Sequence, residues 1–68
     1  MTSKNAIVGY LTEQLTRLRL ERDQLTHDVI TFDADNDDVR AKIARKTVGK
    51  ISVVIADVES LIAWLTLV

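Results

Sequence analysis

The sequence predicts an all-α protein, an antiparallel two-helix hairpin of coiled-coil type that assembles with copies of itself into a helical bundle. Proline is absent and only two of the 68 residues are glycine, so long uninterrupted helices are allowed. Apolar residues recur at alternating gaps of three and four on both sides of a short polar segment, as in packed helices. We expect one domain over residues 1–68, with a helix at about 4–32, a turn at about 33–37 and a second helix at about 38–67.

The first helix is predicted from one row of residues at heptad spacing. Arg22 is the only charged member of this row, and a buried guanidinium needs a partner. We expect it to reach solvent, to pair with an acidic neighbour and fix the helix register, or to belong to a binding site. The row comprises Val8, Leu11, Leu15, Leu18, Arg22, Leu25, Val29 and Phe32.

The turn is predicted from the polar run at residues 33–38, whose short side chains compete with the helical backbone. We expect Asp35 or Asn36 to cap the second helix, with Asp37 and Asp38 beside its positive N-terminal end. The alternate aspartates resemble the start of a calcium-binding EF-hand loop. That motif requires glycine at its sixth position and glutamate at its twelfth, where this chain has Asp38 and Ala44, so no calcium site is expected.

The second helix is predicted from a matching row after the turn. Facing residues of the two helices should have numbers that sum to about 70, because a short connection makes the helices antiparallel neighbours. A further apolar row, Val54, Leu61 and Val68, makes the buried face wider than one partner helix can cover. The main row comprises Ala41, Ala44, Val48, Ile51, Ile55, Val58, Ile62 and Leu65.

Self-association is predicted because so short a chain is only marginally stable alone. The chain has no cysteine for a disulfide and one histidine, His27, which gives little basis for a metal site. A symmetric dimer that forms a four-helix bundle is the simplest arrangement, although higher closed assemblies remain open. The expected interface residues are Ile7, Tyr10, Leu11, Val54, Val58, Leu61, Trp64, Leu65 and Val68.

A basic belt around the middle of the hairpin is a candidate anion site. Arginine offers a bidentate fork and lysine a mobile charge, so the belt could hold a nucleotide or the phosphates of RNA. The alternative is a set of solvated or salt-bridged helix faces, because Glu21, Asp23 and Asp28 lie at the same level. The belt comprises Arg17, Arg19, Arg22, Lys42, Arg45, Lys46 and Lys50.

The turn segment Phe32-Asp33-Ala34-Asp35 between paired short helices resembles that of the Rop family, which are dimeric helical hairpins that bind plasmid RNA. The resemblance is one of architecture, and none of the family's RNA-contacting positions carries over to this chain.

The sequence favours a non-enzymatic interaction protein that needs no cofactor, because no catalytic or metal-ligand constellation is present. The expected partners are further copies of the chain and another protein or other macromolecule, as for an accessory protein of a phage or plasmid. The alternative is a module that sequesters a nucleotide or RNA in the basic belt.

Asp57 and Glu59 interrupt the apolar C-terminal stretch, and no secretory signal is evident. We therefore expect no membrane insertion and a location in the cytoplasm of a cell or an infected host.

Overall fold

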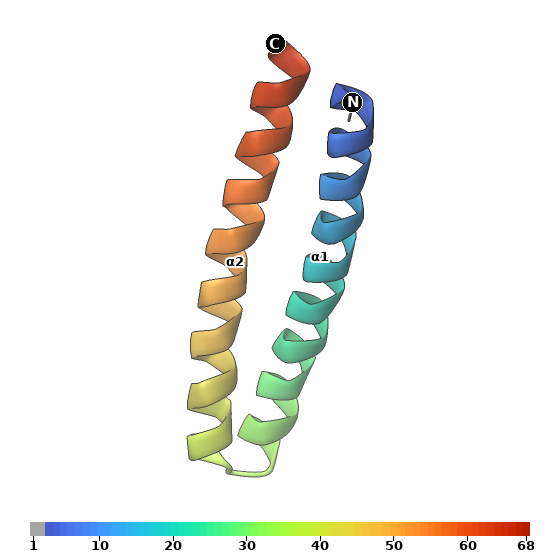
Figure 1. Ribbon diagram of the computed structural model, residues 1–68. Helices are drawn as coiled ribbons and strands as arrows, with labels where there is room; N and C mark the ends of the chain where they lie inside the picture. The colour runs from blue at the N-terminus through green and yellow to red at the C-terminus, as the bar shows by residue number, and fades with distance from the viewer. Residues whose placement is uncertain (1–2) are drawn as a thin grey trace.

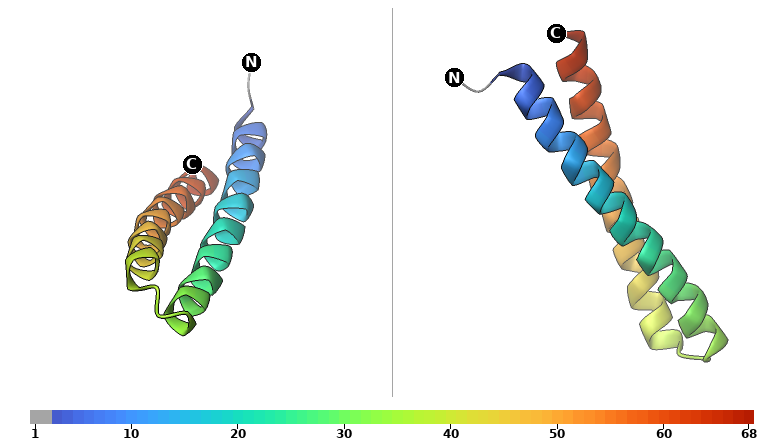
Figure 2. Two further views of the ribbon diagram at one scale, coloured as in Figure 1. Left: turned by 90° about the horizontal axis from the view of Figure 1, so that it is seen from below. Right: turned by 90° about the vertical axis from the view of Figure 1, so that its right-hand side faces the viewer.

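The protein is an antiparallel hairpin of two long helices. A computed structural model describes residues 3–68 and has α1 at Lys4–Ala34 and α2 at Asp38–Leu67. The helices run side by side, with both chain ends at one extremity and the turn at the other (Figures 1 and 2). Helix α1 continues two residues beyond the expected end at residue 32. The hairpin is a rod measuring 52 × 15 × 14 Å.

The turn ends α1 and starts α2 within three residues. Asn36 adopts a left-handed conformation with φ 58°, which asparagine tolerates better than most residues. The amide of Asn36 donates to the carbonyl of Asp33 at 3.2 Å, and that of Asp37 donates to the carbonyl of Phe32 at 2.8 Å. These two bonds around a left-handed residue form a Schellman motif, so orphan carbonyls at the end of α1 are satisfied.

The two helix starts are capped by side chains. Ser3 accepts a hydrogen bond from the amide of Ala6 at 3.2 Å, and Asp37 accepts one from the amide of Arg40 at 3.1 Å. The expectation that Asp35 or Asn36 caps α2 was wrong. Those two residues complete the C-terminal motif of α1, and this leaves Asp37 as the first residue able to cap the next helix.

The core lies along the seam between the helices, which comprises the two predicted rows. All sixteen seam residues are buried or half-buried, whereas most other residues are exposed. Leu15, Ala41, Ala44 and Ile55 are the buried ones. Of these four, the two alanines lie nearest the turn. The hairpin therefore has a core one layer wide, and no large side chain in it is completely buried.

The helices are antiparallel, and residues at the same level have numbers that sum to about 73, not the expected 70. The two seam rows share layers only at this sum, and the turn is centred on Asn36, one residue later than the expectation assumed. Two ion pairs between the helices agree with this register. Arg19 Nη2 lies 3.2 Å from Glu59 Oε2, and Arg45 pairs with Asp33. The numbers in both pairs sum to 78, so each pair joins residues five positions apart in level, a gap that the side chains span because they lean toward the N-terminus of their own helix.

The hairpin has two different sides flanking the seam. One side carries both interhelical ion pairs and is called here the ion-pair face. On the opposite side, Asp28 of α1 lines a hollow together with Arg40 and Thr47 of α2. We call this second side the apolar face. By heptad spacing it comprises, on α1, Ile7, Tyr10, Gln14, Arg17, Glu21, Gln24, Asp28 and Thr31, and on α2, Arg40, Ile43, Thr47, Lys50, Val54, Asp57, Leu61, Trp64 and Val68.

Candidate interface on the apolar face

The α2 part of the apolar face is a second heptad row beside the seam. Its large apolar side chains are strongly exposed: Trp64 is 59% exposed and Val54 is 46% exposed. Leu61 and Val68 are exposed as well, and they lie two turns apart on the same line as Val54. Rows of this spacing are the surfaces through which helices pack against one another, and among residues 3–68 no side chain covers this one.

Helix α1 widens this apolar surface only near the chain ends. Ile7 and Tyr10 are both exposed there, at the level of Leu61, Trp64 and Val68. Further along, the α1 part of the face becomes polar, with glutamine and charged side chains. The apolar face thus has an apolar open end, an apolar strip along α2 and a polar strip along α1.

The expected interface residues divide into two groups. Three of them, Leu11, Val58 and Leu65, lie in the seam and are half-buried within the hairpin itself. The other six lie together on the apolar face and are exposed: Ile7, Tyr10, Val54, Leu61, Trp64 and Val68.

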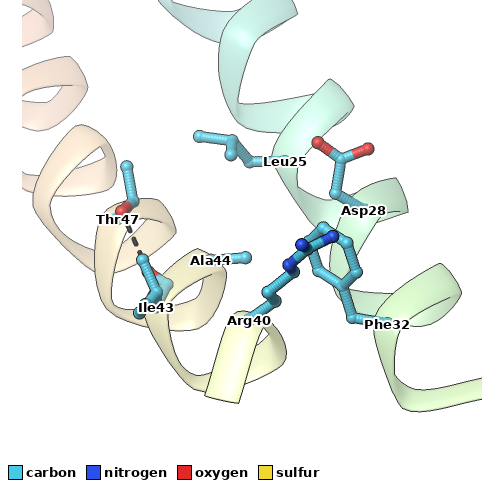
Figure 3. A pocket seen from close by; sticks show the side chains of 7 residues that line it. All are labelled: Leu25, Asp28, Phe32, Arg40, Ile43, Ala44 and Thr47. Carbon is cyan, nitrogen blue, oxygen red and sulfur yellow. Dashed lines mark hydrogen bonds between the residues drawn. The ribbon is translucent and has the colours of Figure 1, made fainter. Parts of the chain in front are cut away.

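A hollow near the turn adds a feature that the sequence interpretation missed. It has a volume of about 310 Å³ and opens on the apolar face between the two helices (Figure 3). Leu25 and Phe32 of α1 and Ala44 of α2 form its apolar wall, and the 60% exposed Ile43 stands at its edge. Ile43 lies three heptads before Trp64 in the same row, so its spacing could have identified it.

The polar groups of this hollow lie at its rim. Asp28 of α1 and Arg40 of α2 line the hollow from opposite helices, and Thr47 directs its hydroxyl to the carbonyl of Ile43 at 2.9 Å (Figure 3). The Thr47 hydroxyl is therefore already satisfied, and the hollow presents mainly carbon to an incoming side chain.

Three residues of the proposed basic belt face carboxylates. Arg19 pairs with Glu59, Arg45 pairs with Asp33, and Arg22 Nε lies 3.9 Å from Asp23 Oδ1. Arg22 keeps a side chain that is 36% exposed although it belongs to the seam, which fits the interpretation that it reaches toward solvent.

The other four belt residues lie on different sides of the hairpin. By helix geometry Arg17 and Lys50 belong to the apolar face, whereas Lys42 and Lys46 lie on other sides of α2. The structure thus does not gather the seven side chains on one surface. Anion binding by the belt stays a prediction.

The accessible surface also indicates an uncovered side. The chain exposes 5200 Å², whereas a compact folded protein of 7.6 kDa exposes about 4300 Å². The excess of about 900 Å² is close to the roughly 800 Å² that each partner buries in a stable protein interface. One interface of ordinary size would bring this hairpin to the exposure of a compact protein.

No protein family, curated protein or solved structure matches this chain. The likeness to the Rop family therefore stays a resemblance of architecture. Within residues 3–68, no three His, Asp or Glu side chains gather closely enough to hold a metal ion. Neither of the two described helices is long and apolar enough to cross a membrane.

Proposed function

We propose that this chain is a non-enzymatic interaction protein that works as a homo-oligomeric helical bundle and engages another macromolecule through its outer surface. The observation that carries the proposal is the apolar face, where Val54, Leu61 and Val68 follow one line of α2, Trp64 lies beside that line, and all four are exposed. Exposed apolar patches of this extent on small proteins usually mark interfaces.

A second copy supplies what a single hairpin lacks. The hairpin core is one layer wide, so each helix hides only one stripe from water. Covering the apolar face with another hairpin gives α2 a second neighbour and creates a core shared by four helices, which is the common arrangement for short amphipathic helices. The favoured assembly is thus a dimeric four-helix bundle.

The outward side of α2 remains available to a different macromolecule in that bundle. Val39, Val53 and Leu67 are each at least 62% exposed and repeat every fourteenth residue, on a line that also carries Lys46. A mixed surface of this kind suits a protein partner with apolar and acidic side chains. The lack of cysteine fits a reducing compartment, so we place this interaction in the cytoplasm of a cell or an infected host.

Native mass spectrometry of the protein as isolated tests the proposal, because it counts subunits and detects any retained protein or nucleotide. We expect a defined oligomer at micromolar concentration. Leu61→Glu should reduce it to monomers, since a carboxylate would be buried in the interface. The control Val53→Glu, on the outward side of α2, should keep the wild-type mass. A folded wild-type monomer under these conditions would refute the proposal.

A further inference from the structure

The apolar row of α2 contains two charges at its centre, and they are placed symmetrically. Lys50 and Asp57 flank Val54, with the lysine four residues before it and the aspartate three residues after it. Both charged residues are exposed, and no ion pair among residues 3–68 includes either of them. From Lys50 to Val68 the other residues of the strip are all apolar, so each of these two charges needs a partner once the strip is covered.

A helix that carries opposite charges at equal distances from a centre can pair each charge with the opposite charge of a second copy only when the two helices are antiparallel. If two α2 helices lie antiparallel and cross near Val54, Lys50 of each copy lies opposite the partner's Asp57, and two identical ion pairs form. If the helices lie parallel in register, lysine faces lysine and aspartate faces aspartate. The charge pattern therefore favours a second copy in antiparallel orientation.

The α1 part of the apolar face leads to the same centre independently. Arg17 and Glu21 carry opposite charges in the middle of this α1 part, and neither belongs to an ion pair within the described residues. An antiparallel pair of α1 helices brings Arg17 opposite the partner's Glu21 when the centre is Arg19. In the hairpin register, with level residues summing to about 73, Arg19 is level with Val54.

The agreement between the two helices is a strong constraint. The same twofold axis relates both helices of one hairpin to those of its partner, so it must cross α1 and α2 at the same level. The charges of α2 place the axis midway between Lys50 and Asp57, and those of α1 place it at Arg19. The two positions differ by about half a residue, or roughly 0.75 Å along the rod. One axis thus satisfies both sets of charges.

The same axis places the end of one copy that lies away from the turn, where Ile7 and Trp64 are, over the hollow of the other copy. Trp64 lies opposite the partner's Ile43, and Leu61 lies opposite the partner's Thr47, two residues that line the hollow. Trp64, the largest exposed side chain of the row, thereby faces the hollow of the partner. On the α1 side, Tyr10 lies opposite the partner's Asp28, where its phenol can donate a hydrogen bond to the carboxylate.

We propose that two copies pack apolar face to apolar face about a twofold axis level with Val54 and Arg19, in antiparallel orientation, held in register by reciprocal pairs of Lys50 with the partner's Asp57 and of Arg17 with the partner's Glu21. This inference rests on the proposed function for its homo-oligomer and adds the orientation, the register and the residues that specify them. The roughly 800 Å² buried per copy in a stable dimer is available in the excess surface of the hairpin.

Charge reversal tests the orientation. Lys50→Asp and Asp57→Lys should each weaken the dimer at least about tenfold, measured by analytical ultracentrifugation, because like charges then meet at two contacts. The double variant Lys50→Asp/Asp57→Lys should recover the wild-type dissociation constant, and an equimolar mixture of the two single variants should form a heterodimer. Single variants that dimerise as tightly as the wild type, or a double variant no tighter than the singles, would overturn the proposal. Far-UV circular dichroism verifies that each variant is helical.

Cysteine cross-linking tests the register without changing a charge. The chain contains no cysteine, so Val54→Cys and Val53→Cys each introduce one thiol. Val54 lies at the proposed axis and should give a covalent dimer on mild oxidation, whereas Val53 lies on the outward side and should not. A wild-type oligomer whose Val54→Cys variant does not cross-link would overturn this register and leave the proposed function standing. A wild-type monomer would overturn both.

Discussion

The seam core makes a clear prediction for Ile55, which is 3% exposed in the middle of α2. Replacing it with alanine removes three carbon atoms. At about 0.8 kcal/mol for each buried methylene this costs about 2.4 kcal/mol, and the cavity left behind raises the loss to about 3 kcal/mol. Chains of this length have a total stability of roughly 3–10 kcal/mol, so Ile55→Ala should remove a large part of it.

Ile30 provides the matched control because it is the same residue type in a long helix but is 63% exposed and lies outside the seam and the apolar face. Ile30→Ala should change the free energy of unfolding by less than about 0.5 kcal/mol. Urea titration followed by circular dichroism, at one protein concentration for all variants, measures both effects. With a denaturant dependence of about 1 kcal/mol per molar, the midpoint for Ile55→Ala should fall by about 3 M. Equal losses for the two variants would refute the described core.

Three smaller effects should follow from the turn, the ion-pair face and the glycines. Asp37→Ala should lower the free energy of unfolding by about 1 kcal/mol in thermal melts because it removes the cap of α2, whereas Asp35→Ala, whose side chain forms no hydrogen bond among the described residues, should leave it nearly unchanged. Arg45→Gln should cost less than about 1 kcal/mol, and the difference should vanish in 1 M salt because the pair is exposed; a loss that persists there would contradict this. Gly49→Ala should stabilise the protein by up to about 1 kcal/mol, since nothing lies within 4 Å of the added carbon and alanine favours the helix; a weaker dimer instead would show that a partner approaches there.

The helical hairpin could be predicted from the sequence because its determinants are local and periodic. A helix repeats every 3.6 residues, so apolar residues at gaps of three and four must share a face, and every residue of the two predicted rows is buried or half-buried. The turn could be located because a run of short polar side chains disfavours helix. The cap of α2 was misplaced because several adjacent residues can cap, and the choice depends on where the backbone of α1 ends.

The surfaces beside the seam depend on tertiary structure. Spacing shows that Val54, Leu61 and Val68 share a line on α2. The side of the hairpin that this line occupies depends on the rotation of α2 about its own axis relative to α1. The interhelical ion pair of Arg19 with Glu59 lies on one side of the seam, and the line of Val54 lies on the other side. Level along the hairpin alone predicts that the seven basic residues of the proposed belt are neighbours, yet residues at one level of a helix can point in any direction around it.

The sequence by itself determined that this chain forms two long amphipathic helices joined by a polar turn, because helix periodicity and turn propensity act over a few residues. Only the tertiary structure decided which charges neutralise one another within the chain, where the hollow beside Phe32 forms, and which apolar side chains remain exposed together on one face. Those features depend on the register and the relative rotation of two rods, which are set by packing between residues far apart in the chain.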